Sequence, residues 1–190
     1  MKKPRALKIA IISSSFRPEV ADALESHCLA TLQRHGVARK HVDVYRVPGS
    51  MEIPLVAKKV AKRDRHDAII TFGAIVKGKT YHFEQIANEC ARGCMNVSWD
   101  YEIPVIFEVL AVYDLADALE RAARKIENKG VEAAETALAM IKQGKKQQAG
   151  QLFATIAKDK SVPQSIRDRS IQIAGSLGVD ASAALGPQAQ

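Results

Sequence analysis

Residues 67–84 read DAIITFGAIVKGKTYHFE, and this stretch decides the fold. Its first six residues form an apolar run that is typical of a buried strand, and residues 84–91 continue with the composition of a helix. The turn between them contains two glycines, two lysines, a threonine and a histidine. In an open parallel sheet, ligands bind beyond the carboxyl ends of the strands, so this turn is a candidate site.

The side chains of this turn suit an anion. Backbone N–H groups at a helix start, beside Lys77, Lys79 and Thr80, match the needs of a phosphate group. His82 can exchange a proton near neutral pH. The local pattern fits a structural role equally well, in which the glycines form the turn and the histidine caps or packs.

Strand and helix patterns alternate on both sides of this stretch. Strands are predicted at residues 7–13, 42–47, 67–72 and 103–110. Helices are predicted at residues 18–35, 53–60, 84–97, 114–125 and 131–141. Alternating elements of this length form βαβ units with right-handed crossovers and a parallel sheet covered on both faces. The predicted fold class is therefore α/β, with a four-stranded parallel sheet.

Three strand ends deliver their turns to one edge of such a sheet. They are residues 14–16, residues 48–52 and the turn around His82. The topology thus predicts that an aromatic ring, a carboxylate, a cationic turn and a histidine lie together. Such a set is enough to bind a polar ring and a phosphate.

The character of the chain changes beyond Gly144. A first helix is predicted from Lys145 through Ala157, and a second from residues 161–163 to Gly175, which together form an α-hairpin. Residues 181–190 are small and polar and are predicted to be disordered. The predicted domains are residues 1–143 and a helical extension, 144–190. The hairpin is too small to fold well alone, so we expect it to pack on the outside of an assembly or to recruit a partner.

Composition narrows the functional classes. No apolar run reaches the roughly 18–20 residues that span a bilayer, and the run from Ile9 to Ile12 is too short for a secretory segment, so a cytoplasmic protein is expected. Residues 1–70 hold 14 Lys and Arg against 7 Asp and Glu, and the remainder balances at 14 against 14. These charges are spread over several elements without interleaved aromatic residues, which favours a solvated basic face over nucleic-acid binding.

The chain has three cysteines, Cys28, Cys90 and Cys94. An odd number without a disulfide framework fits a reducing compartment. Cys90 and Cys94 stand four residues apart on one predicted helix face, where a metal pair is conceivable. Because no further Cys or His has ligand spacing nearby, small buried side chains are the favoured interpretation.

Several motifs in order resemble one family. They are VPGSMEIP at residues 47–54, GAIVKGKTYHFE at 73–84, PVIF at 104–107, ERA at 120–122 and NKG at 128–130. Together they closely resemble 6,7-dimethyl-8-ribityllumazine synthase over about residues 7–143. The resemblance implies a flavodoxin-like three-layer sandwich. It also implies a homopentamer, often packed into an icosahedral shell of 60 copies, with sites between neighbouring subunits.

The resemblance also implies a reaction, the penultimate step of riboflavin biosynthesis. The amine of 5-amino-6-(D-ribitylamino)uracil condenses with 3,4-dihydroxy-2-butanone 4-phosphate, phosphate leaves, and the ring closes. No metal or organic cofactor is needed. The implied partners are these two small molecules, other copies of the chain, and riboflavin synthase as a candidate, with no nucleic acid and no membrane.

Carried over motif by motif, the resemblance assigns roles to individual residues. His82 would shuttle protons during imine formation and phosphate loss. Lys79 and Thr80 would bind the phosphate, and Arg121 would reach it from the adjacent subunit as a bidentate ligand. Lys129 would add positive electrostatic potential at the site. Contacts to the pyrimidine and the ribityl chain would come from Phe16, Ser50, Met51, Glu52, Ala74, Ile75, Val76 and, from the adjacent subunit, Phe107.

Each assignment has a structural alternative. Phe16 can pack within its turn, and Glu52 can act as a helix N-terminal charge. Arg121 can form a helical ion pair, and Phe107 can be a core residue of its strand.

The chain departs from the family pattern at several positions. Arg17 stands where the family usually has Asn, Met51 where it has Phe or Trp, Lys79 where it has a small or acidic residue, and Glu108 where it has Gly. Lys79 could strengthen phosphate binding, whereas Met51 and Glu108 could reshape the pyrimidine pocket. An active enzyme is the leading hypothesis, and a shell-forming or ligand-binding member with weak catalysis is the alternative.

Overall fold

The computed structural model describes residues 6–123 and 127–181, and the chain divides into two compact units, Met1–Ala139 and Met140–Gln190. The strands, all in the first unit, are β1 (Ile9–Ser14), β2 (Val42–Val47), β3 (Ala68–Val76) and β4 (Val105–Val112). The helices are α1 (Pro18–Arg34), α2 (Ile53–Lys62), α3 (His82–Tyr101), α4 (Leu115–Ala123), α5 (Lys129–Lys158) and α6 (Gln164–Ser176). Two short 3-10 helices, η1 (Arg39–His41) and η2 (Ser50–Glu52), complete the elements of the described chain.

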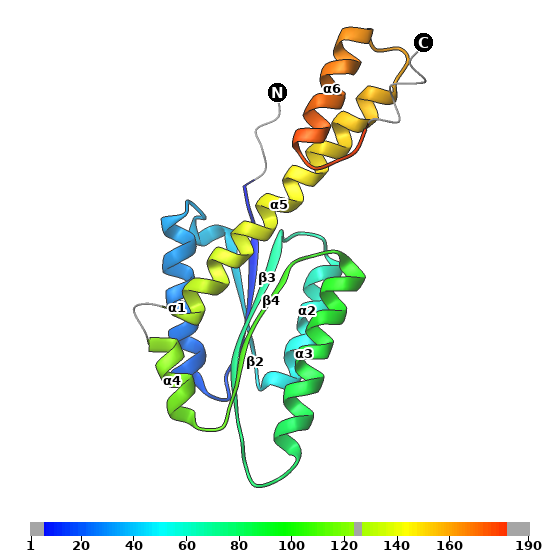
Figure 1. Ribbon diagram of the computed structural model, residues 1–190. Helices are drawn as coiled ribbons and strands as arrows, with labels where there is room; N and C mark the ends of the chain where they lie inside the picture. The colour runs from blue at the N-terminus through cyan, green and yellow to red at the C-terminus, as the bar shows by residue number, and fades with distance from the viewer. Residues whose placement is uncertain (1–5, 124–126, 182–190) are drawn as a thin grey trace. The chain divides into compact units, whose positions relative to one another are not determined.

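The first unit is a three-layer α/β sandwich around one parallel sheet. Its strands are ordered β2-β1-β3-β4, and every pairing is parallel. Helices α1 and α4 cover one face of the sheet, and α2 and α3 cover the other (Figure 1). The predicted four-stranded α/β fold is therefore confirmed.

The two central strands are buried because both of their faces are covered. All six residues of β1 are buried, as are the first eight of β3, and this explains the unbroken apolar runs in the sequence. Ile11 of β1 aligns with Ile70 of β3, which aligns in turn with Ile106 of β4. The register brings the carboxyl ends of β1, β2 and β3 to the same edge of the sheet.

The core on the α2–α3 face fixes the two helices that border the site. Ile12 of β1, Ile53 and Val60 of α2, and Val97 of α3 are buried in one apolar cluster. Gly93 lets α3 approach α2 closely, because a Cβ there would lie 2.7 Å from the Cβ of Pro54. Each fully buried aliphatic side chain of this cluster contributes about 1.5–3 kcal/mol to stability.

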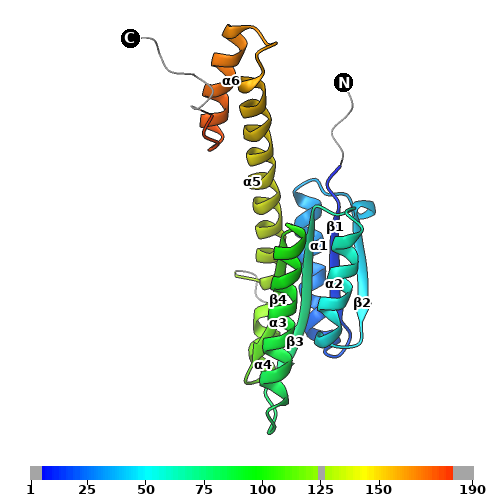
Figure 2. The same ribbon diagram turned by 90° about the vertical axis from the view of Figure 1, so that its right-hand side faces the viewer.

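The second unit contains a helical hairpin. One small apolar cluster contains the buried residues Ala154 of α5, Ala174 of α6 and Ala181. Phe153 and Ile171 pack against this cluster. The predicted helical extension beyond the α/β domain is thus confirmed. Figure 2 shows α6 beside the last turns of α5.

One boundary in this region was predicted wrongly. The two helices expected on either side of Gly144 are the single helix α5, which continues to Lys158. Glycine costs a helix interior only about 0.5–1 kcal/mol. The Lys, Gln and Ala residues that follow it are strong helix formers, so the helix continues. The expected disorder of residues 181–190 falls, apart from Ala181, outside the described residues.

Other helix ends differ modestly from the predictions. Helix α3 begins at His82 rather than residue 84 and runs to Tyr101 rather than residue 97. The end of the helix predicted at residues 114–125 lies partly outside the described chain. Among the helices described, none has the length and apolar character that crossing a membrane requires.

Candidate functional site

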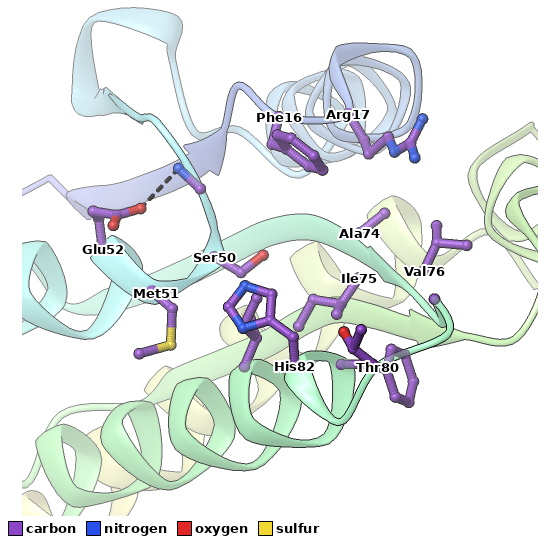
Figure 3. Close-up of a pocket in the computed structure, with 14 residues that line it drawn as sticks. Phe16, Arg17, Ser50, Met51, Glu52, Ala74, Ile75, Val76, Thr80 and His82 are labelled. Atoms are coloured by element: carbon purple, nitrogen blue, oxygen red, sulfur yellow. Dashed lines mark hydrogen bonds between the residues drawn. The ribbon is translucent and has the colours of Figure 1, made fainter.

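A cavity of about 590 Å³ opens at the carboxyl end of the sheet. The turn after β1, the η2 turn, the end of β3 and the first turns of α3 surround it (Figure 3). This is the convergence of three turns that the topology predicted. Of the predicted site residues, the cavity brings together Phe16, Ser50, Met51, Glu52, Ala74, Ile75, Val76, Thr80 and His82.

The turn after β1 presents an aromatic ring to the cavity. The backbone N–H of Ser15 donates to the carbonyl of Val47 over 2.8 Å, and that of Phe16 donates to Ser14 Oγ over 3.2 Å. These bonds hold the turn while Phe16 stays 69% exposed. A ring held in this way offers a face on which a planar ligand can stack.

The η2 turn supplies polar atoms to the next part of the wall. Glu52 Oε2 accepts a hydrogen bond of 2.8 Å from the backbone N–H of Gly49, and the Cys90 thiol of α3 donates to the carbonyl of Ser50 over 3.0 Å. Glu52 therefore caps this turn and lines the cavity at once. Both bonds fix the turn before any ligand arrives.

The loop between β3 and α3 is held by Lys77. Its Nζ donates to Glu84 Oε1 over 2.7 Å and lies 5.6 Å and 5.3 Å from the ring centroids of Phe83 and Tyr113. This hydrogen bond, donated by Lys77 and accepted by Glu84, raises the pKa of Lys77 and lowers the pKa of Glu84. The charge of Lys77 is therefore balanced by Glu84 of the first turn of α3, the helix that begins at His82.

Four predicted site residues do not line this cavity. Lys79 is exposed on the loop, and Phe107 of β4 is partly buried against the core on the α2–α3 face. Arg121 is exposed on α4, where its Nη1 donates to the carbonyl of Asp117 over 3.1 Å. Lys129 forms an ion pair with Glu132 in the first turn of α5. Within one chain, the cavity is formed without them.

Glu108 carries an unusual carboxyl group. It follows Phe107 on β4 and is half-buried. Burial raises the pKa of Glu108 to about 7, an effect that Lys129 opposes and Glu132 reinforces. The carboxyl group therefore titrates near neutral pH close to Lys129, one of the residues that the family resemblance assigns to the adjacent site.

The cysteines give no support to a metal pair. Cys28, Cys90 and Cys94 are all free and buried. The structure uses the Cys90 thiol as a hydrogen-bond donor to the η2 turn. In the part of the chain that the structure describes, no three His, Cys, Asp or Glu side chains are grouped to hold a metal ion.

The cavity also has lining residues that sequence reasoning did not assign. They are Arg17, Gly49, Gly78, Phe83 and Ile86. The glycines belong to motifs that were already recognised. Phe83 and Ile86 are three positions apart, so they share one face of α3, a spacing that could have been found had the helix start been placed at His82. Arg17 was noted only as a departure from the family pattern.

Comparison with known families supports the resemblance. The family described as 6,7-dimethyl-8-ribityllumazine synthase matches residues 6–145, which is well over half of the chain. The match includes every residue that lines the cavity. Residues 1–5 and 146–190 lie outside it.

Proposed function

Because the chain belongs to the 6,7-dimethyl-8-ribityllumazine synthase family, we propose that it is a transferase of riboflavin biosynthesis that makes 6,7-dimethyl-8-ribityllumazine. Its substrates would be 5-amino-6-(D-ribitylamino)uracil and 3,4-dihydroxy-2-butanone 4-phosphate. The observation that carries the proposal is one cavity inside the matched region. It brings together the aromatic ring of Phe16, the turn-capping carboxylate of Glu52, and His82 at the start of α3.

The reaction suits these residue types. The amine attacks the ketone to give an imine and water, phosphate leaves from the four-carbon chain, and ring closure releases a second water. Holding two substrates together supplies much of the rate acceleration through proximity and orientation. His82 would accept and donate the protons that these steps move. No step requires a group beyond the protein and its substrates.

The lining residues would divide the substrates between them. Phe16 would stack on the pyrimidine, while the η2 turn and the backbone of residues 74–76 would hold its edge and the ribityl chain. Thr80, through its hydroxyl and N–H, and the neighbouring Lys79 would bind the phosphate. These are the roles that the family motif suggests for side chains at this cavity.

The remaining predicted residues would act on another copy of the chain. Phe107, Arg121 and Lys129 lie away from their own chain's cavity, which agrees with a role at a neighbouring subunit's site. We therefore propose a homo-oligomer, a pentamer or a larger shell, whose formation completes the site. Sizing by light scattering would distinguish these forms.

The proposal is tested by mixing the purified chain with both substrates and following lumazine absorbance. His82→Ala should slow the reaction by about 10²–10⁴-fold, because that is the usual contribution of a general acid–base group. His35→Ala is the matched control, since His35 is exposed at the end of α1 and does not line the cavity. A His82→Ala enzyme as fast as the wild type would remove this residue from the mechanism, and an inactive wild type would refute the proposed reaction.

A ligand-binding or shell-forming member with weak catalysis is the second candidate. One observation favours it: Met51 lines the cavity where the family pattern has an aromatic residue. Such a protein would bind the pyrimidine or its product and assemble, yet show no lumazine formation in the same assay.

Domain limits and location are also proposals. We place the catalytic domain at residues 1–143 and regard 144–190 as an extension that is not needed for chemistry, since every cavity-lining residue precedes residue 87. The extension could recruit a partner, for which riboflavin synthase is one candidate. Three free thiols fit a cytoplasmic setting.

A further inference from the structure

Arg17 is a cavity-lining cation whose role is unassigned. It lies at the N-terminal boundary of α1 and lines the same cavity as Thr80 and His82. In Figure 3 the Arg17 side chain extends away from Phe16 on the same side of the view as Val76, and Glu52 lies on the opposite side. The cavity thus has a cationic end and an acidic end.

The bonding of Arg17 leaves its charge available. Its Nε is buried without a hydrogen-bond partner, and within the described residues the guanidinium forms no ion pair with a carboxylate. Arg17 Cζ lies 5.5 Å from the centroid of the neighbouring Phe16 ring, a contact that leaves the positive charge of the guanidinium in place. Because the buried Nε is closed to solvent, an incoming anion would be bound by the terminal nitrogens of the guanidinium.

The other cations near this edge of the sheet are already engaged. Lys77 is bonded to Glu84, and Arg46 of β2 is paired with Asp22 and Glu25 of α1. Lys79 is exposed and does not line the cavity. Among the described Arg and Lys residues that line the cavity, Arg17 is therefore the one that can hold an anion inside it.

From this we propose that Arg17 is a phosphate-binding residue that acts within its own subunit. It would hold the phosphate of the four-carbon substrate through its two terminal nitrogens, opposite the hydroxyl of Thr80. Guanidinium groups bind phosphate in this two-point manner and are poorly replaced by lysine. The inference rests on the proposed function for the identity of the substrate, but the anion site itself does not.

The test uses the full chain with inorganic phosphate as the probe, titrated by calorimetry. Arg17→Met should weaken phosphate binding by about 10- to 100-fold, the range expected when a charge-assisted, two-point hydrogen bond is lost. Arg17→Lys keeps the charge without the planar fork, so its phosphate affinity should lie between those of the wild type and Arg17→Met. Arg34→Met is the matched control, because Arg34 carries the same charge, is exposed at the end of α1 and lies outside the cavity.

Kinetics separate a phosphate contact from a general loss of structure. In Arg17→Met the KM for the butanone phosphate should rise while the KM for the ribitylaminouracil stays within about twofold, because only one substrate carries the anion. Circular-dichroism melting verifies that each variant is folded, and Arg17→Lys supplies the measurement if Arg17→Met does not fold.

Three results would overturn the assignment of Arg17. The first is an unchanged phosphate affinity in a folded Arg17→Met. The second is an Arg17→Met enzyme in which only the KM for the ribitylaminouracil rises. The third is loss of phosphate binding in Arg121→Met but not in Arg17→Met. If instead the wild type forms no lumazine, the proposed reaction fails, and the phosphate titration still decides whether Arg17 holds an anion.

Discussion

Replacement of Asn128 by alanine is expected to destabilise the first unit by about 2–4 kcal/mol. Asn128 is 2% exposed and precedes α5. Its Oδ1 accepts bonds from the N–H groups of Gly130 (2.9 Å) and Val131 (3.2 Å), and its Nδ2 donates to the carbonyl of Ala122 over 2.7 Å. One side chain therefore caps α5 and joins it to the end of α4.

The magnitude follows from these bonds. Loss of a helix N-cap costs about 1 kcal/mol, and a buried carbonyl left without its donor costs about 1–3 kcal/mol more.

Urea unfolding followed by circular dichroism measures the change as a lower midpoint with an unchanged slope. Asn128→Asp keeps the cap acceptor but sets a carboxylate oxygen against the Ala122 carbonyl, so it should also destabilise the unit. Asn88→Ala is the control: Asn88 is exposed on α3 and should change stability by less than about 0.5 kcal/mol. An equally small change in Asn128→Ala would refute the capping argument.

Three further outcomes are expected. Because burial raises the pKa of Glu108 from 4.5 to about 7, the folded state binds more protons than the unfolded state between these values, so wild-type stability falls as the pH rises through that window. Glu108→Gln should remove about 1–2 kcal/mol of this fall after allowance for solvent screening. Urea melts at pH 5 and 8 measure the effect, and an equal loss of stability between these pH values in the wild type and in Glu108→Gln would contradict the prediction. Gly130→Ala should cost at least about 1–3 kcal/mol, because its Cβ would lie 2.2 Å from the carbonyl oxygen of Leu24, whereas Gly144→Ala, with open space around it, should be neutral or stabilising in the same thermal melts. Deleting residues 145–190 should leave the lumazine assay unchanged, and a large loss of rate would show that the extension supports the site.

The fold could be predicted because burial leaves a simple trace in the sequence. Strands β1 and β3 are covered on both faces, so each appears as an unbroken apolar run. Once the strands are parallel, their carboxyl ends must share an edge, and the meeting of Phe16, Glu52 and His82 follows from topology alone. Local propensity and chain order were sufficient for this part of the site.

Side-chain partners were harder to predict, since they depend on geometry that the sequence does not display. Three cations, Arg17, Lys77 and Lys79, lie in or beside the turns that form the site, and their order does not reveal which of them faces the cavity. The structure bonds Lys77 to Glu84, seven residues away, and places Arg17 in the wall of the cavity. A two-residue error in the start of α3 was enough to hide the cavity-facing pair, Phe83 and Ile86, because a helix rotates by about 100° with each residue.

These partners change the interpretation of the lysine-rich turn that first marked the site. With the charge of Lys77 balanced by Glu84, the turn contributes Thr80, backbone N–H groups and an exposed Lys79 rather than a buried cation. A phosphate enclosed in the cavity therefore needs a cation from elsewhere, because an anion removed from water without a compensating charge is strongly disfavoured. Arg17 meets that need within the chain, and Arg121 of a neighbouring copy would meet it across an interface. If both contribute, binding of the phosphate would begin in the isolated subunit, and assembly would add the second clamp that promotes its departure.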